Sequence, residues 1–119
     1  MSETPKVNLE SKEILSILRE IKKSPDVTQR ELSANLGISL GKVNFLLRAL
    51  IYKGHIKVHN FKKSNNKYAY LYHLTPEGIQ EKMRITYRFL KRKMREYEEL
   101  EEEIRQLQTE IAKSERTEI

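Results

Sequence analysis

Residues 28–54, TQRELSANLGISLGKVNFLLRALIYKG, decide how the rest of the chain is organised. Thr28 followed by Glu31 is a capping box, in which the hydroxyl accepts a hydrogen bond from the third helical amide, so a helix should begin there. Gly37 supplies the left-handed residue that commonly ends a helix, and Ser39 is a second N-cap. A further glycine closes the stretch. The pattern therefore predicts two short helices joined by a tight turn.

The second of these helices should bury one face and present the other to a partner. Its apolar residues follow the i, i+3, i+4, i+7 spacing of a half-buried helix: Val43, Leu46, Leu47 and Leu50. The outward positions contain no carboxylate and are Leu40, Gly41, Lys42, Asn44, Phe45 and Arg48. In a DNA major groove, Arg pairs bidentately with guanine and Asn with adenine, while Lys42 and the first-turn amides can hold phosphates. An ordinary amphipathic surface helix is the alternative that this helix alone leaves open.

The charge of the chain is sorted along its length. Residues 1–95 hold 20 of the 23 Lys and Arg and 8 of the 17 acids, a net charge of +12, whereas residues 96–119 have a net charge of −6. No Asp or Glu lies between Glu31 and Glu77, a stretch that contains seven Lys and Arg residues. Such a run indicates a polyanion partner, and a solvated basic face is the plainer alternative.

Composition narrows the class of protein further. A length of 119 residues fits one domain with an appendage. Cysteine is absent, which excludes disulfides and thiolate zinc sites. The first residues have no apolar run typical of a signal peptide, and no segment reaches transmembrane length. We therefore expect a cytoplasmic protein.

The elements on either side of the central stretch should complete a small α+β domain. Residues 1–9 are expected to form a flexible arm, and residues from about 10 to 23 a helix whose apolar residues are Ile14, Ile17, Leu18 and Ile21. Residues 55–61 and 68–74 alternate as strands do, and the polar residues between them predict a hairpin with a basic tip. The lysines Lys62, Lys63 and Lys67 at this tip can reach phosphates, although edge lysines also serve solubility.

The tyrosines and histidines of the hairpin are expected to have structural roles. Its tyrosines, Tyr68, Tyr70 and Tyr72, could stack single-stranded bases, but an alternating row of Tyr more often packs against a core. The histidines His55, His59 and His73 have no nearby carboxylate or cysteine to complete a metal site. Because the sequence shows no nucleophile with a base partner, no paired carboxylates in a cleft and no glycine-rich phosphate loop, we expect neither a cofactor nor enzyme activity.

Thr75, Pro76 and Glu77 predict the start of a long last helix, through an N-cap, a first-turn proline and a first-turn acid. Residues 76–113 should form this helix, and residues 114–119 a frayed tail. Apolar residues recur at steps of three and four, as in a coiled coil, with one phase slip between Tyr97 and Leu100. We expect dimerisation through the apolar seam that comprises Leu90, Met94, Tyr97, Leu100, Ile104 and Leu107.

The order of these elements resembles the winged helix-turn-helix domain of MarR-family bacterial transcriptional regulators. The matching residues are Leu32 to Val58 and the LTPEG segment at 74–78, and the resemblance covers residues 10–85. The whole chain is similar to the small regulators of this family that accompany exopolysaccharide biosynthesis loci. By the family pattern, Ser39, Gly41, Lys42, Asn44, Phe45 and Arg48 would face the major groove, and Lys62, Lys63 and Lys67 would lie on the wing.

The resemblance implies a fold and a function. We expect an α+β protein with a winged helix-turn-helix domain at 10–75 and a long C-terminal coiled-coil helix. It would bind double-stranded DNA as a homodimer, with the last helices antiparallel because their basic and acidic halves would then face each other. Larger MarR proteins shape an effector pocket with helices from both chain ends, whereas this chain is expected to have only an arm before its first helix. The resemblance therefore carries over neither an effector nor the sign of regulation. A module that binds RNA or an acidic protein is the rival interpretation.

Overall fold

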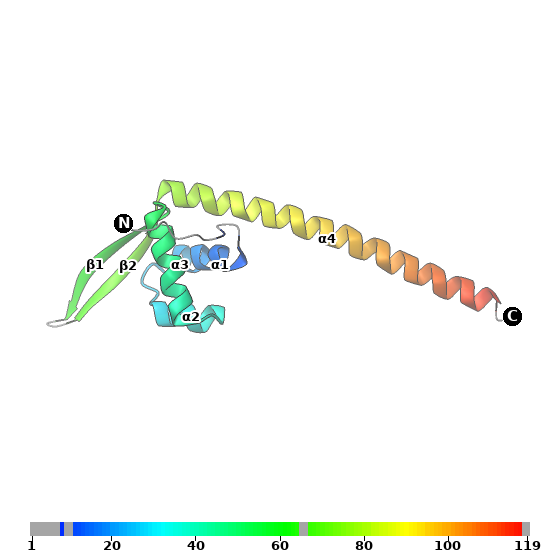
Figure 1. Ribbon diagram of the computed structural model, residues 1–119, viewed down its shortest axis with the longest axis horizontal. Helices are drawn as coiled ribbons and strands as arrows, with labels where there is room; N and C mark the ends of the chain where they lie inside the picture. Colours follow the sequence, from blue (N-terminus) through cyan, green and yellow to red (C-terminus); the bar gives the residue numbers. More distant parts are fainter. Residues whose placement is uncertain (1–7, 9–10, 65–66, 118–119) are drawn as a thin grey trace. The chain divides into compact units, whose positions relative to one another are not determined.

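The computed structural model describes residues 8, 11–64 and 67–117, and the side chains of residues 63, 64, 67 and 68 lie outside the described part. Three helices are followed by a two-stranded antiparallel hairpin and a long helix (Figure 1). Their bounds are α1 Lys12–Lys23, α2 Gln29–Leu36, α3 Leu40–Tyr52, β1 Ile56–Ser64, β2 Lys67–Leu74 and α4 Pro76–Thr117. The expected α+β winged fold is confirmed. The predicted arm at residues 1–9 lies outside the described residues except for Asn8.

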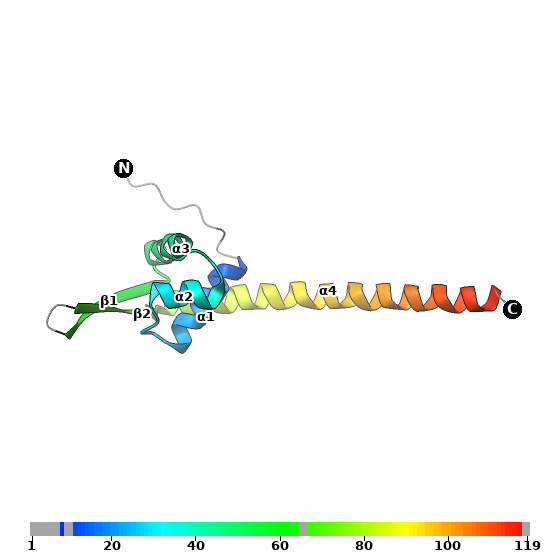
Figure 2. The same ribbon diagram turned by 90° about the horizontal axis from the view of Figure 1, so that it is seen from below.

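The first three helices form the core at the base of the hairpin (Figure 2). α1 packs against α2 and β2, while α3 packs against α2 and β1. The side chains predicted to face inward from α1 and α3 are all buried: Ile14, Ile17, Leu18, Ile21, Val43, Leu46, Leu47 and Leu50. Apolar burial of this kind contributes about 1.5–3 kcal/mol for each large side chain, so these residues hold the domain together.

Local signals in the sequence fix where the helices begin and end. The Thr28 hydroxyl accepts a hydrogen bond from the amide of Glu31 at 3.0 Å, and that of Ser39 accepts from Lys42 at 3.1 Å. Gly37 adopts a φ of 68°, the left-handed conformation that a side chain would oppose. The tight turn bends α3 by 113° relative to α2, as in DNA-binding helix-turn-helix motifs.

The hairpin is longer than the alternation of apolar residues predicted. Its strands pair from Ile56 opposite Leu74 to Ser64 opposite Lys67, with an irregularity next to Lys62. Lys62, Lys63 and Lys67 therefore lie in strands, and not in the turn that their polarity suggested. Backbone groups make the ladder of hydrogen bonds, so it can continue through polar residues.

The expectation that the row of tyrosines packs against the core is correct for Tyr72 and wrong for Tyr70. Tyr72 is 4% exposed, whereas Tyr70 is 54% exposed although it points to the same face of β2. The amide of Tyr72 also donates a hydrogen bond to the Pro25 carbonyl at 2.9 Å. Because only the base of the hairpin packs on the helices, residues farther along it remain open to solvent. The side chain of Tyr68 lies outside the described part.

The start of α4 is held against the end of α3 and the start of β1. The Thr75 hydroxyl accepts from the amide of Gly78 at 2.9 Å and donates to the Gly54 carbonyl at 2.5 Å. A Cβ on Gly78 would overlap the carbonyl oxygen of His55, so only glycine fits this approach without a shift. Ile85, farther along the same helix, is fully buried. The first turns of α4 are therefore part of the winged domain.

The chain divides into two compact units, Met1–Thr86 and Tyr87–Ile119. The predicted boundary at residue 75 thus falls about ten residues before the structural one, because the packing of Gly78 and Ile85 joins the helix start to the winged domain. The helix also continues to Thr117, where residues from 114 onward were expected to fray. Neither proline nor glycine occurs after Gly78 to stop it.

Within the described residues, no individual helix is long and apolar enough to cross a membrane. The bent pair of α2 and α3 could do so on length and composition alone.

Candidate nucleic-acid interface

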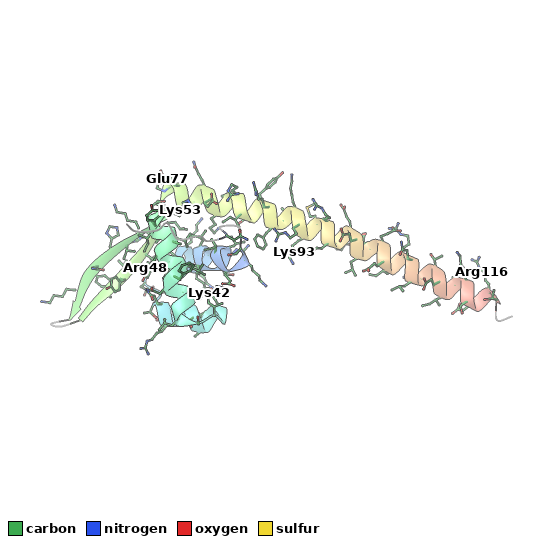
Figure 3. All side chains as sticks on the ribbon, viewed as in Figure 1. Lys42, Arg48, Lys53, Glu77, Lys93 and Arg116 are labelled. Carbon is green, nitrogen blue, oxygen red and sulfur yellow. The ribbon has the colours of Figure 1, made fainter. Side chains whose placement is uncertain are left out.

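One face of α3 is open to solvent and basic. Gly41, Lys42, Phe45 and Arg48 are exposed there, and Asn44 is half-buried. Lys42, Arg48 and Lys53 follow one another along this helix and its end (Figure 3). No residue of α3 carries a negative charge, so the helix itself repels neither phosphates nor the acceptor-rich edge of guanine. The positions that the sequence assigned to the outer face of this helix thus lie together on its open face.

The start of α3 has room for the sugar–phosphate backbone of a nucleic acid. Nothing lies within 4 Å of where a Cβ on Gly41 would stand, and Ser39 and Leu40 before it are exposed. The Ser39 hydroxyl already accepts from the amide of Lys42, so it caps the helix and retains its own proton for donation. This helix start combines first-turn amides with the positive end of the helix dipole, which suits a phosphate.

Asn44 is already engaged by a neighbouring side chain. Its Nδ2 donates a hydrogen bond to Oε1 of Gln29 at 3.3 Å, and Nε2 of Gln29 donates to the hydroxyl of Tyr72 at 3.3 Å. The three residues belong to α3, α2 and β2, so a partly buried polar chain connects the candidate reading helix to the wing. The carboxamide of Asn44 is therefore oriented before any ligand arrives.

Lys42 has an acidic partner on α1. Its Nζ lies 3.0 Å from Oε2 and 3.2 Å from Oε1 of Glu13. Both side chains remain substantially exposed, at 50% and 36%. An ion pair of this kind contributes about 0–1 kcal/mol, so Lys42 can leave it for another anion at small cost.

The wing supplies further positive charge. Lys62 is exposed on β1, while only the backbone of Lys63 and Lys67 is described. Lys57, nearer the base of the same strand, is also exposed. The wing is thus basic along β1, and what the side chains of Lys63 and Lys67 touch lies outside the described part.

A groove of about 730 Å³ runs between the wing and the start of α2. Phe61 and Tyr70 of the hairpin line one wall, and Gln29, Arg30 and Leu40 are among the residues of the other. Phe61 and Tyr70 lie on neighbouring rungs of the hairpin ladder, since Phe61 pairs with Ala69 and Asn60 with Tyr70. The groove therefore gives the side of the winged domain an aromatic wall beside the start of α3.

Two histidines of the hairpin form a ring pair. The rings of His59 on β1 and His73 on β2 meet edge to face, with centroids 5.4 Å apart. The two residues are diagonal neighbours in the ladder between the strands. Among the described residues, no three or more His, Cys, Asp or Glu side chains lie close enough to hold a metal ion.

The apolar seam lies in the second unit, and its side chains are exposed on the surface of the helix. Leu90, Met94, Tyr97, Leu100, Ile104 and Leu107 are all between 46% and 64% exposed. Met94 and Tyr97 line a shallow depression together with Lys93, Glu98 and Glu101. A row of large apolar side chains on one face of a helix is typical of a surface that another helix covers.

Two residues of the interface could not be found in the sequence pattern. Gln29 follows the N-cap of α2 and would ordinarily be a neutral helix residue, and Glu13 is an ordinary first-turn acid of α1. Their roles come from side-chain interactions with Asn44 and Lys42, which are 15 and 29 residues away in the sequence. The acid-free run between Glu31 and Glu77 gave no sign of either interaction.

Known proteins that resemble this chain share its fold class and its helix-turn-helix geometry. Residues 14–57 match the family of winged helix-turn-helix DNA-binding domains. Among solved structures, Streptococcus pneumoniae FabT in complex with DNA is 29% identical, with a TM-score of 0.55, and the match covers 72% of this chain and 58% of that one. Staphylococcus aureus MarR in complex with salicylate and kanamycin is 26% identical, with a TM-score of 0.52, over 67% of this chain and 52% of that one.

A third structure, of a MarR family transcription regulator, shares the fold at 17% identity and a TM-score of 0.58, over 87% of this chain and 74% of that one. This chain spans only about half to three-fifths of the length of FabT and of the S. aureus MarR. No curated protein matches the chain. The expected winged helix-turn-helix fold and the likeness to MarR-family regulators are both confirmed.

Proposed function

We propose that this chain is a sequence-specific, double-stranded DNA-binding regulator of transcription, of the MarR type, that acts as a homodimer in the cytoplasm. One observation carries the proposal: α3 presents Asn44 and Arg48 one helical turn apart on a helix that has no acid of its own. Each side chain has the hydrogen-bonding groups that distinguish one base pair from another in the major groove. The similarity to FabT, which was solved with DNA, supports the same function here.

In this proposal, different residues supply affinity and selectivity. Lys42 and the amides at the start of α3 hold phosphates, and Ser39, Gly41 and Phe45 lie against the DNA beside them. The wing lysines Lys62, Lys63 and Lys67 bind phosphates outside the groove, because an ammonium group lacks the planar fork that reads a base edge bidentately. Arg48 and Asn44 contact base edges and so supply the selectivity for one DNA sequence.

The genes controlled are those of exopolysaccharide biosynthesis, a proposal that rests on the likeness of the whole chain to small regulators of such loci. Occlusion of a promoter, or recruitment of polymerase to it, would follow from binding at the operator. Neither a cofactor nor catalysis is required for this mechanism.

The nature of the nucleic acid can be tested by titrating the full chain with random duplex DNA and with random RNA at several salt concentrations. We expect tighter binding to duplex DNA, with a log–log salt slope of about −0.9 for each phosphate bound. Equal or tighter binding to RNA would favour the rival module, and a salt-independent affinity would contradict binding of phosphates by the basic face.

Dimerisation is proposed to use the second unit. The seam from Leu90 to Leu107 is exposed on a helix, and covering it with a second copy would remove several large apolar side chains from water. The copies would run antiparallel because charge is divided into blocks. A basic block precedes residue 96 and comprises Lys82, Arg84, Arg88, Lys91, Arg92, Lys93 and Arg95; an acidic block follows and comprises Glu96, Glu98, Glu99, Glu101, Glu102 and Glu103.

A parallel pair would place acid beside acid and base beside base. An antiparallel pair that crosses near residues 95 and 96 places each basic block opposite the acidic block of the partner. Surface ion pairs contribute only about 0–1 kcal/mol each, but the avoidance of like charges selects an orientation when the apolar packing is similar in both.

The orientation can be measured with spin labels, since the chain has no cysteine of its own. Single labels at Glu103→Cys should lie about 20 Å or more apart in the antiparallel dimer, because each lies about seven to eight residues from the crossing point. Labels at Glu96→Cys are the matched control and should lie within about 10–15 Å of each other. Short distances at both positions would show a parallel pair, and no coupling at either would show that the chain does not dimerise through this helix.

A further inference from the structure

We propose that Gln29 is a positioning residue for base recognition, which fixes the carboxamide of Asn44 in the orientation that reads the DNA. The inference rests on the proposed function, because it concerns how a side chain assigned to base reading is prepared for that task. It begins from the two hydrogen bonds that join Asn44 to Gln29 and Gln29 to Tyr72.

Asn44 keeps the groups that reading a base requires. A carboxamide has two N–H donors and one acceptor oxygen. One N–H of Asn44 is taken by Oε1 of Gln29, which leaves the second N–H and the oxygen. An adenine presents one acceptor and one donor in the major groove, so the remaining pair of groups is the one that adenine requires. The hydrogen bond with Gln29 therefore leaves Asn44 one donor and its acceptor, the two kinds of group that an adenine contact uses.

The same hydrogen bond fixes the orientation of the Asn44 carboxamide. The terminal torsion of an asparagine is broad, so an isolated side chain would rotate and exchange the places of its oxygen and nitrogen. In the structure Oε1 of Gln29 faces Asn44 and Nε2 faces Tyr72, so the hydrogen bond holds the nitrogen of Asn44 toward α2. Fixing a side chain in its bound conformation before binding removes an ordering cost, which corresponds to about 2- to 10-fold in affinity.

Gln29 is itself held at both its backbone and its side chain. It is the first residue of α2, directly after the cap residue Thr28, so its backbone is fixed by the helix start. Its own amide nitrogen donates to the hydroxyl of Tyr72, a buried residue of β2. The backbone amide of Tyr72 in turn donates to the carbonyl of Pro25, a residue of the loop that precedes α2. The base of the wing is thus part of the support for the reading side chain.

Gln29→Met in the full chain is the most direct test, since methionine keeps the length of the side chain and removes both hydrogen bonds. The measurement compares dissociation constants, at one salt concentration, for the operator selected by the unaltered protein and for the same duplex changed at the base pair that Asn44→Ala shows to be read. We expect Gln29→Met to lower this discrimination by about 2- to 10-fold, less than Asn44→Ala does, with much smaller effects on random DNA.

Three matched variants separate positioning from general damage. Gln29→Glu keeps an acceptor for Asn44 and can accept from the Tyr72 hydroxyl, so it should retain discrimination while its added charge weakens binding to all duplexes. Tyr72→Phe keeps the buried ring and removes the hydroxyl, so it should lower discrimination by less than Gln29→Met. In the Asn44→Ala background, Gln29→Met should have no further effect on discrimination.

The outcomes distinguish this inference from the proposed function. If the unaltered protein shows no preference among duplexes, the proposed function fails. If it does show a preference, but Gln29→Met and Tyr72→Phe both keep full discrimination, the positioning role of Gln29 is overturned while the function stands. The inference is also overturned if Asn44→Ala leaves discrimination at every base pair unchanged.

Discussion

The ammonium group of Lys42 lies 3.0 Å from a carboxylate oxygen of Glu13, so the start of α3 is tied to the first turn of α1 by an exposed ion pair. In the proposed function, the same ammonium holds a phosphate of the DNA. Glu13 would therefore compete with DNA for Lys42. The exchange is close to neutral in free energy, because a half-exposed pair contributes about 0–1 kcal/mol.

Replacing Glu13 by Gln should strengthen binding to every duplex by up to about 5-fold, since Lys42 would no longer have to leave a carboxylate. The increase should appear on random and selected DNA alike, because binding to a phosphate carries no sequence information. Equilibrium titrations at low salt would measure it. Glu20→Gln is the matched control, since it makes the same change of charge on α1 at a residue outside the Lys42 ion pair. Equal effects of the two substitutions would contradict a specific competition for Lys42.

Arg48→Ala should cost about 1–3 kcal/mol on the preferred operator and much less on random DNA, because the proposed function has the guanidinium read a base edge. Arg48→Lys keeps the charge and removes the planar fork, so it should lose most of the same discrimination while retaining most of the affinity for random DNA. Fluorescence anisotropy on both duplexes would decide. Equal losses on the two DNAs would mean that Arg48 positions the protein and reads nothing.

Changing Lys62, Lys63 and Lys67 together to Gln should weaken binding across all sequences. It should also flatten the log–log salt dependence by up to about 0.9 for each phosphate that the wing no longer binds. The matched control removes three exposed lysines from α1, by changing Lys12, Lys22 and Lys23 to Gln. The control should change the slope much less than the wing variant does. If the wing variant leaves the slope unchanged, the wing binds no phosphate.

Gly78→Ala should destabilise the winged domain by about 1–3 kcal/mol, because the new Cβ would overlap the carbonyl oxygen of His55 and force α4 away from it. Gly41→Ala is the matched control, since nothing lies within 4 Å of its Cβ position. That change should stabilise α3 by up to about 1 kcal/mol. Urea unfolding at one fixed chain concentration would measure both. A Gly78→Ala protein as stable as the unaltered one would show that the close approach is relieved at no cost.

The helices of the winged domain could be predicted from the sequence because their signals are local. A cap such as Thr28 or Ser39, and a closing glycine such as Gly37, act within a few residues, and the apolar spacing of α1 and α3 specifies which faces are buried. The length of the hairpin was harder to predict from the sequence. Its ladder continues through polar residues because the pairing is between backbones.

The side-chain interactions of the interface could not be predicted, since they join residues of different helices. The pairing of Lys42 with Glu13, and of Asn44 with Gln29, depends on how α1, α2 and α3 pack, which no local pattern encodes. The exposure of Tyr70 has the same origin, because alternation assigns a side chain to a face of the hairpin but not to a neighbour. Residue types thus indicated the proposed recognition face, and packing determined which of its side chains are already engaged.

The central claim is that the chain binds duplex DNA as a dimer and reads its sequence, and selection of bound duplexes from a random pool tests it most directly. We predict that one motif is enriched, with two related half-sites whose centres lie about 10 bp or a multiple of that apart, as two recognition helices of a symmetric dimer require. A pool that remains random after repeated rounds of binding, although the protein retains duplex DNA at low salt, would contradict it.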